Sequence, residues 1–375
     1  MWLQALSLTD FRSYEQLDLQ FSPGVTAFVG RNGQGKTNIV EAVAYLSTLS
    51  SHRVAQDAPL IRSGANHAVV RARVVEDDRS VSVDVQINPS GSNKARINRA
   101  AATRARDALG IVRAVMFAPE DLALVRGDPS ERRRFLDEMT VQRHPRMSGV
   151  RSDYDKVLRQ RNALLKSSYG RSTSTIRETL TSWDEQLIEF GTDLIRSRLQ
   201  FAGDLTPMVQ QAYERVAGAA AVDIRYRPSS ASLQAVVERS DPQSADITTA
   251  FAEDLRVRID DELRRGVTLV GPHRDELELE LDGFPVKGYA SHGESWSMAL
   301  ALRLGAADVL RSDGVDPIII LDDVFAELDT ERRRHLAELV RSATQVFITA
   351  AVEQDVPAEL DGARFHVGIG QVTTA

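Results

Sequence analysis

The segment Gly30–Thr37 restricts the fold of this chain more than any other feature, because it matches the pattern G-x-x-x-x-G-K-[ST] at every fixed position. It follows Val25–Val29, a short apolar stretch typical of a strand, and precedes Asn38–Leu46, where apolar residues recur at helical spacing. A strand, a glycine-rich loop and a helix in this order form a nest of backbone N–H groups that binds phosphates. The pattern therefore predicts a nucleoside-triphosphate site, although a glycine-rich turn can match it by chance.

The chemistry of such a loop assigns a role to each of its residues. The Lys36 ammonium is expected to reach the outer phosphates, and the Thr37 hydroxyl is expected to ligate Mg²⁺. The helix that follows directs its positive N-terminal end at the nucleotide. The predicted nucleotide-binding residues are Gly30, Arg31, Asn32, Gly33, Gln34, Gly35, Lys36, Thr37 and Asn38.

Composition narrows the class of protein. A length of 375 residues favours two domains, and 42% hydrophobic with 26% charged residues is ordinary for a soluble globular chain. The absence of cysteine excludes disulfides, thiolate metal sites and thiol nucleophiles. No apolar run reaches 18 residues and the first residues lack a signal peptide, so we expect a cytoplasmic protein without membrane contact. A net charge of −7 argues against non-specific coating of nucleic acid but allows a local basic patch.

The texture of the sequence changes twice along the chain. Residues 1–125 combine the phosphate loop with alternating strand patterns, including a predicted hairpin formed by 68–75 and 81–87. Residues 126–262 are charged and mainly helical, with a Ser/Thr/Gly break at 167–175 between two helices expected to pair antiparallel, and with a polar, loop-rich stretch at 229–244. Residues 263–375 return to apolar strands. We therefore predict one α/β ATPase domain built from both ends of the chain, 1–125 and 263–375, with a helical insertion domain between them.

A second landmark is the apolar run Pro317–Leu321, which ends in the carboxylates Asp322 and Asp323. In a phosphate-loop protein, such a strand places an acid beside Mg²⁺. Asp322 is the predicted carboxylate on the metal side, acting through water, and Asp323 is the predicted catalytic residue that orients or deprotonates the attacking water. Two adjacent acids after a strand could also form a turn or a helix cap.

The third landmark is Ser291-His-Gly293-Glu294, which precedes a predicted helix at 294–310. It resembles the signature motif of ABC-type ATPases, in which Ser and Gly bind the γ-phosphate held by the opposite subunit. A hydroxyl and backbone N–H groups at a helix start do form an anion site. A plain helix-capping sequence explains the same letters. The order of phosphate loop, insertion, signature and acidic strand favours an ABC-type head that dimerises around two ATP molecules.

Within that class the chain resembles the RecF family, relatives of the SMC heads that lack long coiled coils. The likeness covers both ends of the chain and the start of the insertion, whereas residues 140–260 match only in helical texture. Two differences stand out: the family signature is more often Gln-rich where this chain has Glu294, and ABC transporters carry Glu at Asp323 and a switch His at Thr349. The resemblance rests on the phosphate loop and on residues 8–14, 51–53, 117–122, 127–129, 132–137, 271–275 and 321–329.

The resemblance implies a weak, slow ATPase with ATP and Mg²⁺ as cofactors, in which Arg12 contacts the nucleotide and Asp329 belongs to the D-loop. It implies an ATP-dependent homodimer that clamps duplex DNA and single-strand/duplex junctions during recombinational DNA repair and replication-fork maintenance, within the SOS response. RecR is the implied direct partner, and RecO and RecA are indirect partners.

Two other classes compete with this hypothesis. A nucleotide-binding subunit of an ABC transporter would contain the same motifs, but the missing switch His and the charged insertion count against it. A small-molecule kinase could use the phosphate loop, but the signature Ser291 and the paired acids argue against it.

Several other residues carry weaker expectations. Arg12 and Arg53 resemble phosphate-contacting arginines of SMC-type heads, although an exposed arginine can simply be solvated. His273 and Arg274 are expected to be structural, with Arg274 paired to Asp275. The candidates for a DNA-facing basic surface are Arg104, Arg106, Arg113 and Arg132–Arg134.

Overall fold

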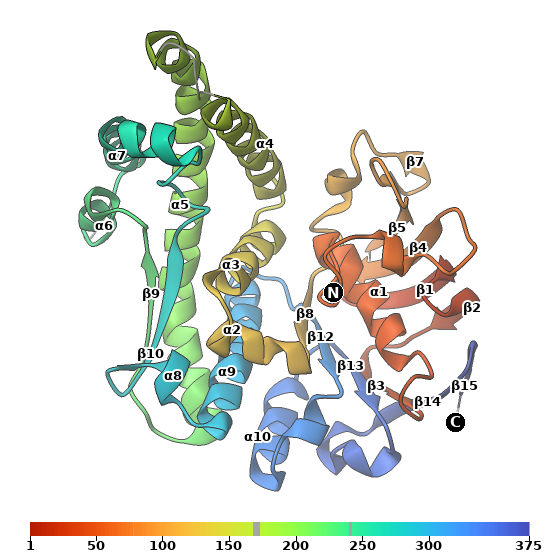
Figure 1. Cartoon of the computed structure of the whole chain (residues 1–375). Coiled ribbons are helices and arrows are strands. Elements are labelled where there is room, and N and C mark those ends of the chain that lie inside the picture. Colours follow the sequence, from red (N-terminus) through yellow and green to blue (C-terminus); the bar gives the residue numbers. More distant parts are fainter. Residues whose placement is uncertain (78, 168–172, 240–241, 375) are drawn as a thin grey trace. The chain divides into compact units, whose positions relative to one another are not determined.

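The computed structural model describes all residues except 78, 168–172, 240–241 and 375. Its contacts divide the chain into two compact units, which are described separately below. The first unit contains residues 1–125, 207–220 and 290–375, and the second contains 126–206 and 221–289 (Figure 1). The chain thus passes between the units several times, and the long helix α5 (Thr173–Ala217) contributes to both.

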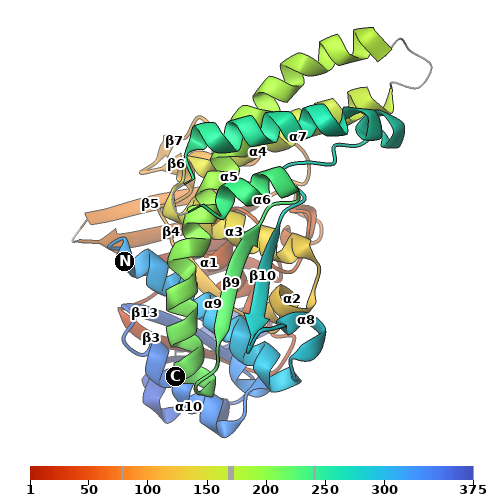
Figure 2. The same cartoon turned by 90° about the vertical axis from the view of Figure 1, so that its left-hand side faces the viewer.

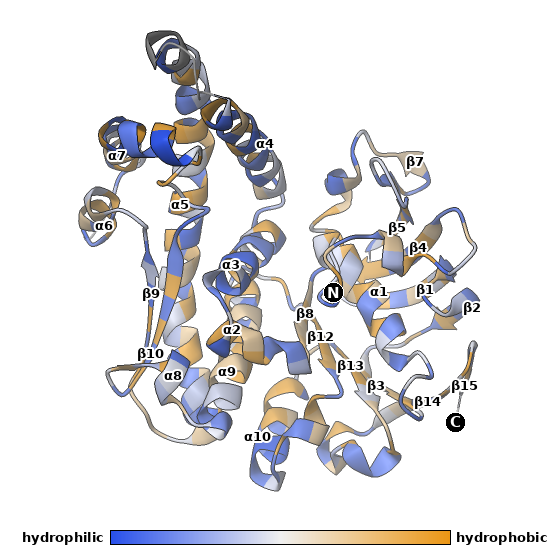
Figure 3. Ribbon diagram, in the orientation of Figure 1, coloured by the Kyte–Doolittle hydropathy of each residue, from blue (hydrophilic) through white to orange (hydrophobic). Residues whose placement is uncertain are grey.

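The phosphate loop belongs to a six-stranded mixed sheet in the first unit. The strand order is β15-β14-β3-β13-β12-β8, and every neighbouring pair is parallel except β14 and β15. The inner strands are hydrophobic along their length (Figure 3), as expected of parallel strands buried on both faces. The bounds are β3 Gly24–Val29, β8 Ala114–Phe117, β12 Ile318–Asp322, β13 Gln345–Ala350, β14 Gly362–Gly368 and β15 Gln371–Thr374.

A second sheet in the same unit is antiparallel throughout, in the order β2-β1-β4-β5-β6-β7. The hairpin predicted from residues 68–75 and 81–87 is present as β4 and β5. Alternate residues of these strands are buried, so one face covers a core and the other is exposed or half-buried. The bounds are β1 Trp2–Phe11, β2 Tyr14–Gln20, β4 Ala68–Glu76, β5 Arg79–Ile87, β6 Lys94–Ile97 and β7 Ala100–Ala101.

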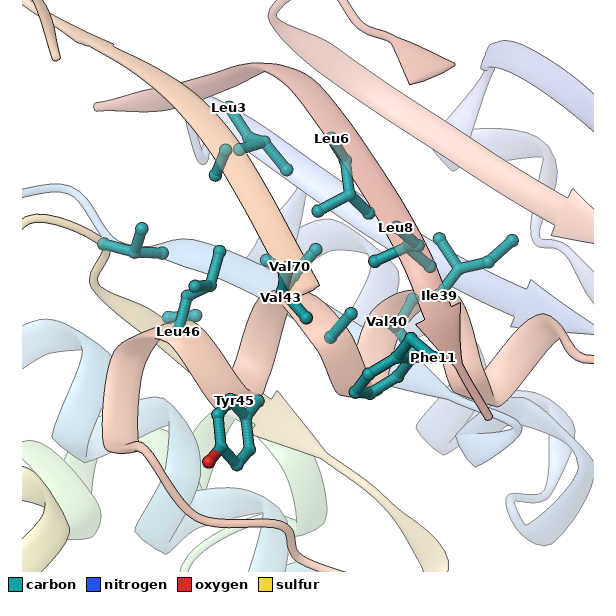
Figure 4. Close-up of a cluster of buried hydrophobic side chains, with 14 of the residues drawn as sticks. Leu3, Leu6, Leu8, Phe11, Ile39, Val40, Val43, Tyr45, Leu46 and Val70 are labelled. Atoms are coloured by element: carbon teal, nitrogen blue, oxygen red, sulfur yellow. The ribbon is translucent and has the colours of Figure 1, made fainter. Parts of the chain in front are cut away.

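Helix α1 (Lys36–Thr48) packs its apolar residues against the antiparallel sheet (Figure 4). Leu6 and Leu8 of β1 and Ile39 and Val43 of α1 are at most 1% exposed and belong to one cluster. Full burial of each such side chain stabilises the fold by about 1.5–3 kcal/mol. The core therefore fixes the first turn of α1, which closes the phosphate loop. The unit also contains helices α9 (His292–Ser312) and α10 (Thr330–Val340).

The second unit combines helices with the three-stranded antiparallel sheet β11-β10-β9 (Figure 2). Helices α4 and α5 run antiparallel, as predicted. The order of their contacts shows this, since Arg161 pairs with Asp184 and the later residue Leu165 packs on the earlier residue Leu180. The strands are β9 Val222–Arg227, β10 Glu276–Leu281 and β11 Phe284–Pro285. The helices are α2 Leu122–Arg126 at the boundary of the units, α3 Pro129–Arg143, α4 Met147–Lys166, α6 Ala231–Val237, α7 Ser244–Arg265 and α8 Val286–Tyr289.

Three local expectations differ from the structure. The stretch 229–244, predicted as a loop, contains α6, which Ser230 caps by accepting from the Leu233 N–H at 3.2 Å. The second helix of the predicted pair, expected over 176–199, extends in the structure as α5 from Thr173 to Ala217 and passes through Pro207. Arg274 donates to the Thr268 carbonyl at 3.1 Å rather than pairing with Asp275. Most of the predicted break at 167–175 lies outside the described residues.

The compact units and the predicted domain division differ at two places. Residues 263–289, predicted as ATPase domain, fall in the second unit because β10 pairs along its length with β9. Residues 207–220 fall in the first unit although they lie inside the predicted insertion of 126–262. The position of residues 263–289 depends on strand pairing between distant segments, which the pattern of residue types along the chain does not reveal.

Candidate nucleotide site

The phosphate loop is shaped by glycines in conformations that other residues rarely adopt. Gly33 and Gly35 have φ of +81° and +104°, in the left-handed region. A Cβ at Gly30 would lie 2.3 Å from the Val367 carbonyl oxygen of β14. Helix α1 begins after Gly35 without a side-chain cap, so its first N–H groups remain suited to an anion.

Lys36 lies within the loop it completes. Its side chain is 3% exposed, and Nζ donates to the carbonyl oxygens of Gly30 at 2.8 Å and Arg31 at 3.4 Å and to Asn32 Oδ1 at 3.3 Å. These acceptors are neutral, so bound phosphate oxygens would be stronger partners for the ammonium. The arrangement holds the lysine within reach of the predicted phosphates.

The two predicted acids stand at the end of β12, beside α1. Asp322 Oδ1 accepts hydrogen bonds from the Thr37 hydroxyl at 3.0 Å and the Thr349 hydroxyl at 2.6 Å. The Asp323 N–H donates to Thr349 Oγ1 at 2.9 Å, and Asp323 has φ of +49°. Burial foremost, and then the charges of Asp323 and Glu120, raise the pKa of Asp322 to about 6, although the hydroxyls lower it. The structure thus brings Thr37 and Asp322, which are 285 residues apart, into contact.

Arg12 and Arg53 meet at a buried carboxylate on α1. Arg12 donates to Glu41 through Nε at 2.8 Å and Nη2 at 2.6 Å, and Arg53 Nη1 lies 3.4 Å from the same carboxylate. Ser51 Oγ donates to Glu41 at 2.6 Å. Burial favours the neutral acid, yet the hydrogen bonds from Arg12 and Ser51 hold the pKa of Glu41 below its ordinary value. Arg53 also donates to Asn38 at 3.2 Å, which joins this network to the loop.

The predicted signature residues form the start of α9. Ser291 Oγ accepts from the Glu294 N–H at 3.2 Å, and Glu294 accepts from the Ser291 N–H at 2.7 Å, which is a capping box. A Cβ at Gly293 would lie 3.0 Å from Arg332 Nη2. Arg332 in turn pairs with Asp329, the cap of α10. Among the described residues, the polar contacts of this segment do not reach the phosphate loop.

Sequence reasoning missed two groups at this site. In the sequence Thr349 stands out only because ABC transporters carry a histidine there, yet its hydroxyl joins the two acids. Tyr14 is fully buried, and its hydroxyl donates to the Gly35 carbonyl at 3.2 Å. Neither residue lies in a motif with a known phosphate chemistry, and only the packing of distant strands reveals them.

The arginines of the insertion that were candidates for DNA contact have internal partners. Arg132 makes a bidentate pair with Glu276 at 2.8 Å, and Arg133 donates to the Asp275 carbonyl at 2.8 Å. Arg134 lies near Glu131 and Glu138 on the same helix. Arg132 and Arg134 are therefore paired with carboxylates of the second unit, whereas Arg133 has a neutral carbonyl partner.

Comparison with known proteins places this fold and site in a class. The family model described as the RecF/RecN/SMC N-terminal domain matches residues 2–364. SMC head domains, including one from Pyrococcus furiosus, have the same fold, with a TM-score of 0.56 at 16% identity over 100% of this chain and 96% of that chain. The chain thus has the fold of an ABC-type ATPase head of the SMC kind.

The chain belongs to the RecF family. It is 52% identical to the DNA replication and repair protein RecF of Nocardioides sp., over 99% of both chains, and 53% identical to that of Frankia alni, over 100% of both. A solved structure of the recombination mediator protein RecF with ATP matches with a TM-score of 0.87 at 26% identity, over 100% of this chain and 99% of that chain. These relatives do not favour the transporter hypothesis. No helix within the described residues is long and apolar enough to span a membrane.

Proposed function

We propose that this protein is an ATP-dependent DNA-binding protein of recombinational DNA repair and replication-fork maintenance. ATP closes a head-to-head homodimer that clamps DNA at gaps and single-strand/duplex junctions, and slow hydrolysis releases it. The observation that carries the proposal is the contact of Thr37 with Asp322 beside Lys36, in a chain of the RecF family. The names of the relatives, which are DNA replication and repair proteins, support the DNA role.

The residues at the loop fit a magnesium nucleotide. Thr37 Oγ1 and Asp322 Oδ1 are hard oxygen donors 3.0 Å apart, and the buried Asp322 carboxylate with its raised pKa would be stabilised by a nearby cation. Mg²⁺ commonly uses one or two protein oxygens together with substrate phosphates. Among the described residues, no cluster of three His, Asp or Glu side chains could hold a metal by protein ligands alone. Bound Mg²⁺ would neutralise charge on the phosphates.

The remaining residues divide between the two subunits. Asp323 orients the attacking water, Lys36 and the loop N–H groups hold the phosphates, and Arg12 contacts the nucleotide from its Glu41 anchor. Ser291, Gly293 and Glu294 of one subunit face the γ-phosphate held by the other, with Asp329 at the same interface. The exposed start of α9 supports this role because the N–H groups of His292 and Gly293, which the capping box does not use, can bind an anion.

RecR is the direct partner in this proposal, and RecO and RecA act downstream in the same process, in the cytoplasm. A solved relative is described as a recombination mediator in the RecFOR pathway, which supports this set of partners.

Complementation between two variants tests the composite site. Lys36→Ala removes the loop ammonium, and Ser291→Arg leaves the loop intact but blocks the approach of the second subunit. Each variant alone is expected to stay monomeric with ATP, whereas a mixture should partly dimerise. The mixed dimer has one site with an intact loop and an intact signature. Sedimentation of the mixture with ATP measures this.

Two outcomes would contradict the proposal. If wild type dimerises with ATP but the mixture does not, the sites are not shared between subunits. Normal ATP affinity of Lys36→Ala would refute the loop assignment. A kinase confined to one chain predicts no rescue, and transfer of phosphate to a metabolite would favour it.

A further inference from the structure

The antiparallel sheet of the first unit has one face that packs on α1 and one face that does not. Leu6, Leu8 and Val70 point into the core (Figure 4), so their neighbours in sequence point the other way. Strand register places the outward residues in rows across the sheet, with Arg71 opposite Ser7 on one side and Asp84 on the other. The outward row continues to Arg96 of β6, which is paired with Asp84.

This face carries more positive charge than its own carboxylates neutralise. Arg71 is 48% exposed and lies 3.8 Å from Asp84, which is its ion-pair partner. Arg73, Lys94 and Arg96 are exposed, and within the described part of the chain none of them has an ion pair. Asp84 therefore stands between two arginines and neutralises at most one of them. Asp18 on β2 marks the far edge of the face.

The positive charge continues past the edge of the sheet. The hairpin joining β6 to β7 turns at Asn98 and Arg99, with φ of +49° and +71°, and Arg99 is exposed at its tip. Arg104 and Arg106 follow in a short 3-10 turn that packs beside β6. The acid in this stretch, Asp107, accepts from the Arg104 N–H at 2.8 Å as a local cap. Residues 94–106 thus contribute five cations and no acid, in a chain whose net charge is −7.

We propose that the outward face of this sheet, together with the β6–β7 hairpin, is a docking surface for the phosphate backbone of duplex DNA. This basic sheet face is defined by Arg71, Arg73, Lys94, Arg96, Arg99 and Arg104. The proposal rests on the function proposed above and assigns the DNA contact to particular residues.

The arrangement of the cations on this face suits the phosphates of a nucleic-acid backbone better than other anionic partners. Neighbouring strands lie about 4.8 Å apart and alternate residues about 6.8 Å apart, so the four cations on β4 and β6 form a grid about 10 Å across. Ser7, Thr9, Ser82 and Gln86 share the face and supply hydroxyl and amide groups of the kind that contact phosphates. A grid of this kind recognises backbone charge and carries no base sequence information.

The positions of the exposed apolar side chains also favour duplex DNA as the ligand of this face. Among the described residues, the large hydrophobic side chains that are exposed lie elsewhere, at Val257, Phe284, Tyr289, Val352 and Ile369. The aromatic residue that the register places on this face, Trp2 opposite Val75, is half-buried, so the face offers no fully exposed ring for stacking unpaired bases within the described residues, which favours duplex over single-stranded DNA. None of the exposed large hydrophobic side chains lies on this face, so within the described residues it has no protruding apolar anchor for a bilayer or for a protein hot spot.

Charge removal on the face tests the proposal. The double variant Arg73→Ala/Arg96→Ala should bind a labelled duplex at least tenfold more weakly in the presence of ATP. The slope of log affinity against log salt should become shallower by about 2. The matched control, Arg215→Ala/Arg341→Ala, removes the same charge from exposed positions of the same unit and should bind as wild type. Anisotropy across a salt series measures both.

A variant that gains affinity tests whether misfolding, and not lost charge, weakens DNA binding in the double variant. Asp84→Asn removes the carboxylate between Arg71 and Arg96, so duplex affinity should rise about two- to fivefold and the salt slope should steepen. ATP affinity and ATP-dependent dimerisation should remain those of wild type in every variant, because the face is separate from the loop residues.

The outcomes separate this inference from the proposed function. Wild-type duplex affinity in the double variant, or equal weakening in the control pair, would overturn the surface assignment while leaving ATP-dependent DNA binding intact. Failure of wild type to bind duplex with ATP would overturn the proposed function itself. Loss of binding to phosphatidylserine vesicles in the double variant, with duplex binding unchanged, would assign the face to a lipid surface instead.

Discussion

The phosphate loop of the first unit and the buried network of the second unit both hold charged groups away from water, but their partners differ in kind. Lys36 is satisfied by neutral carbonyl oxygens of its own loop, and Asp322 by two hydroxyls. In the second unit, Arg161 is fully buried between the carboxylates Asp184 and Glu262. Charges with neutral partners can exchange them for a ligand, whereas charges paired with each other stabilise one structure.

The motif at residues 271–275 shows the second kind of network most clearly. The Tyr154 hydroxyl lies 2.7 Å from His273 Nδ1, and the buried Asp275 accepts from the Tyr226 hydroxyl and from the Ser229 N–H at 2.8 Å. A Cβ at Gly271 would lie 2.6 Å from the Tyr154 hydroxyl oxygen. These contacts explain the motif as packing within the second unit.

The largest expected effect is in the second unit. Glu262→Ala leaves Arg161 buried with one fewer carboxylate and deprives the Leu269 N–H of its acceptor at 2.7 Å. Breaking a buried pair by removing one partner costs about 3–5 kcal/mol of the free energy of unfolding. Arg227→Gln, which breaks the exposed pair with Glu278, is the control and should cost at most about 1 kcal/mol. Urea unfolding measures both; equal costs would contradict the contrast drawn between the two kinds of pair.

Acid should weaken the second unit through His273. Burial foremost lowers the pKa of His273 to about 4, from an ordinary value of 6.5. A depressed pKa gives stability that is present above pH 6.5 and is lost as pH falls through 4, for a total of about 3 kcal/mol. The difference in unfolding free energy between wild type and His273→Gln should shrink over this window. A difference that stays constant from pH 7.5 to 4 would refute the assignment.

At the phosphate loop, acid should increase the stability of the folded state, opposite to its effect through His273. Because the pKa of Asp322 is raised to about 6, protonation favours the folded state, and this contribution is lost as pH rises from about 4 through 6. Asp322→Asn should therefore stabilise the nucleotide-free protein by about 2–3 kcal/mol at pH 8 and by little at pH 4. Thermal unfolding across pH measures this. A variant less stable than wild type at pH 8 would contradict it.

Asp323→Asn is the matched control one residue away, and it also tests catalysis. Asp323 is half-buried, and its side chain does not receive the Thr37 and Thr349 hydrogen bonds. We expect this variant to bind ATP normally and to hydrolyse it more slowly, because an amide cannot accept the water proton. Turnover equal to wild type would remove Asp323 from its proposed role.

Much of the site was predictable because its chemistry is local. The pattern from Gly30 to Thr37 implies backbone geometry that few other sequences adopt, and the structure shows the positive φ values it requires at Gly33 and Gly35. The acidic strand was equally clear, since a buried apolar run followed by two acids has few interpretations beside a phosphate loop. The antiparallel pairing of the insertion helices followed from a polar break between two helical patterns.

What the sequence could not provide depends on contacts between distant segments. Arg12 and Ser51 converge on Glu41, and Thr349 bridges the two acids, although none of these pairs is recognisable by spacing. The pairing of β9 with β10 moved residues 263–289 into the second unit. Side-chain partners across a sheet depend on register, and register is set by packing that a single sequence does not display.

The sequence by itself therefore determined the class of protein, the glycine-rich loop and the acidic strand end that lies beside it, because these depend on short-range backbone geometry and on residue chemistry. The tertiary structure decided which arginines form ion pairs within the protein and which remain available to contact a ligand. Arg132 is occupied by Glu276, whereas Arg73 and Arg96 share an outward sheet face and have no ion-pair partner among the described residues. The physical reason is that a charge is neutralised by the opposite charge that the fold places within a few ångströms of it. For Arg132 that partner is distant in the sequence, so the sequence alone does not reveal it.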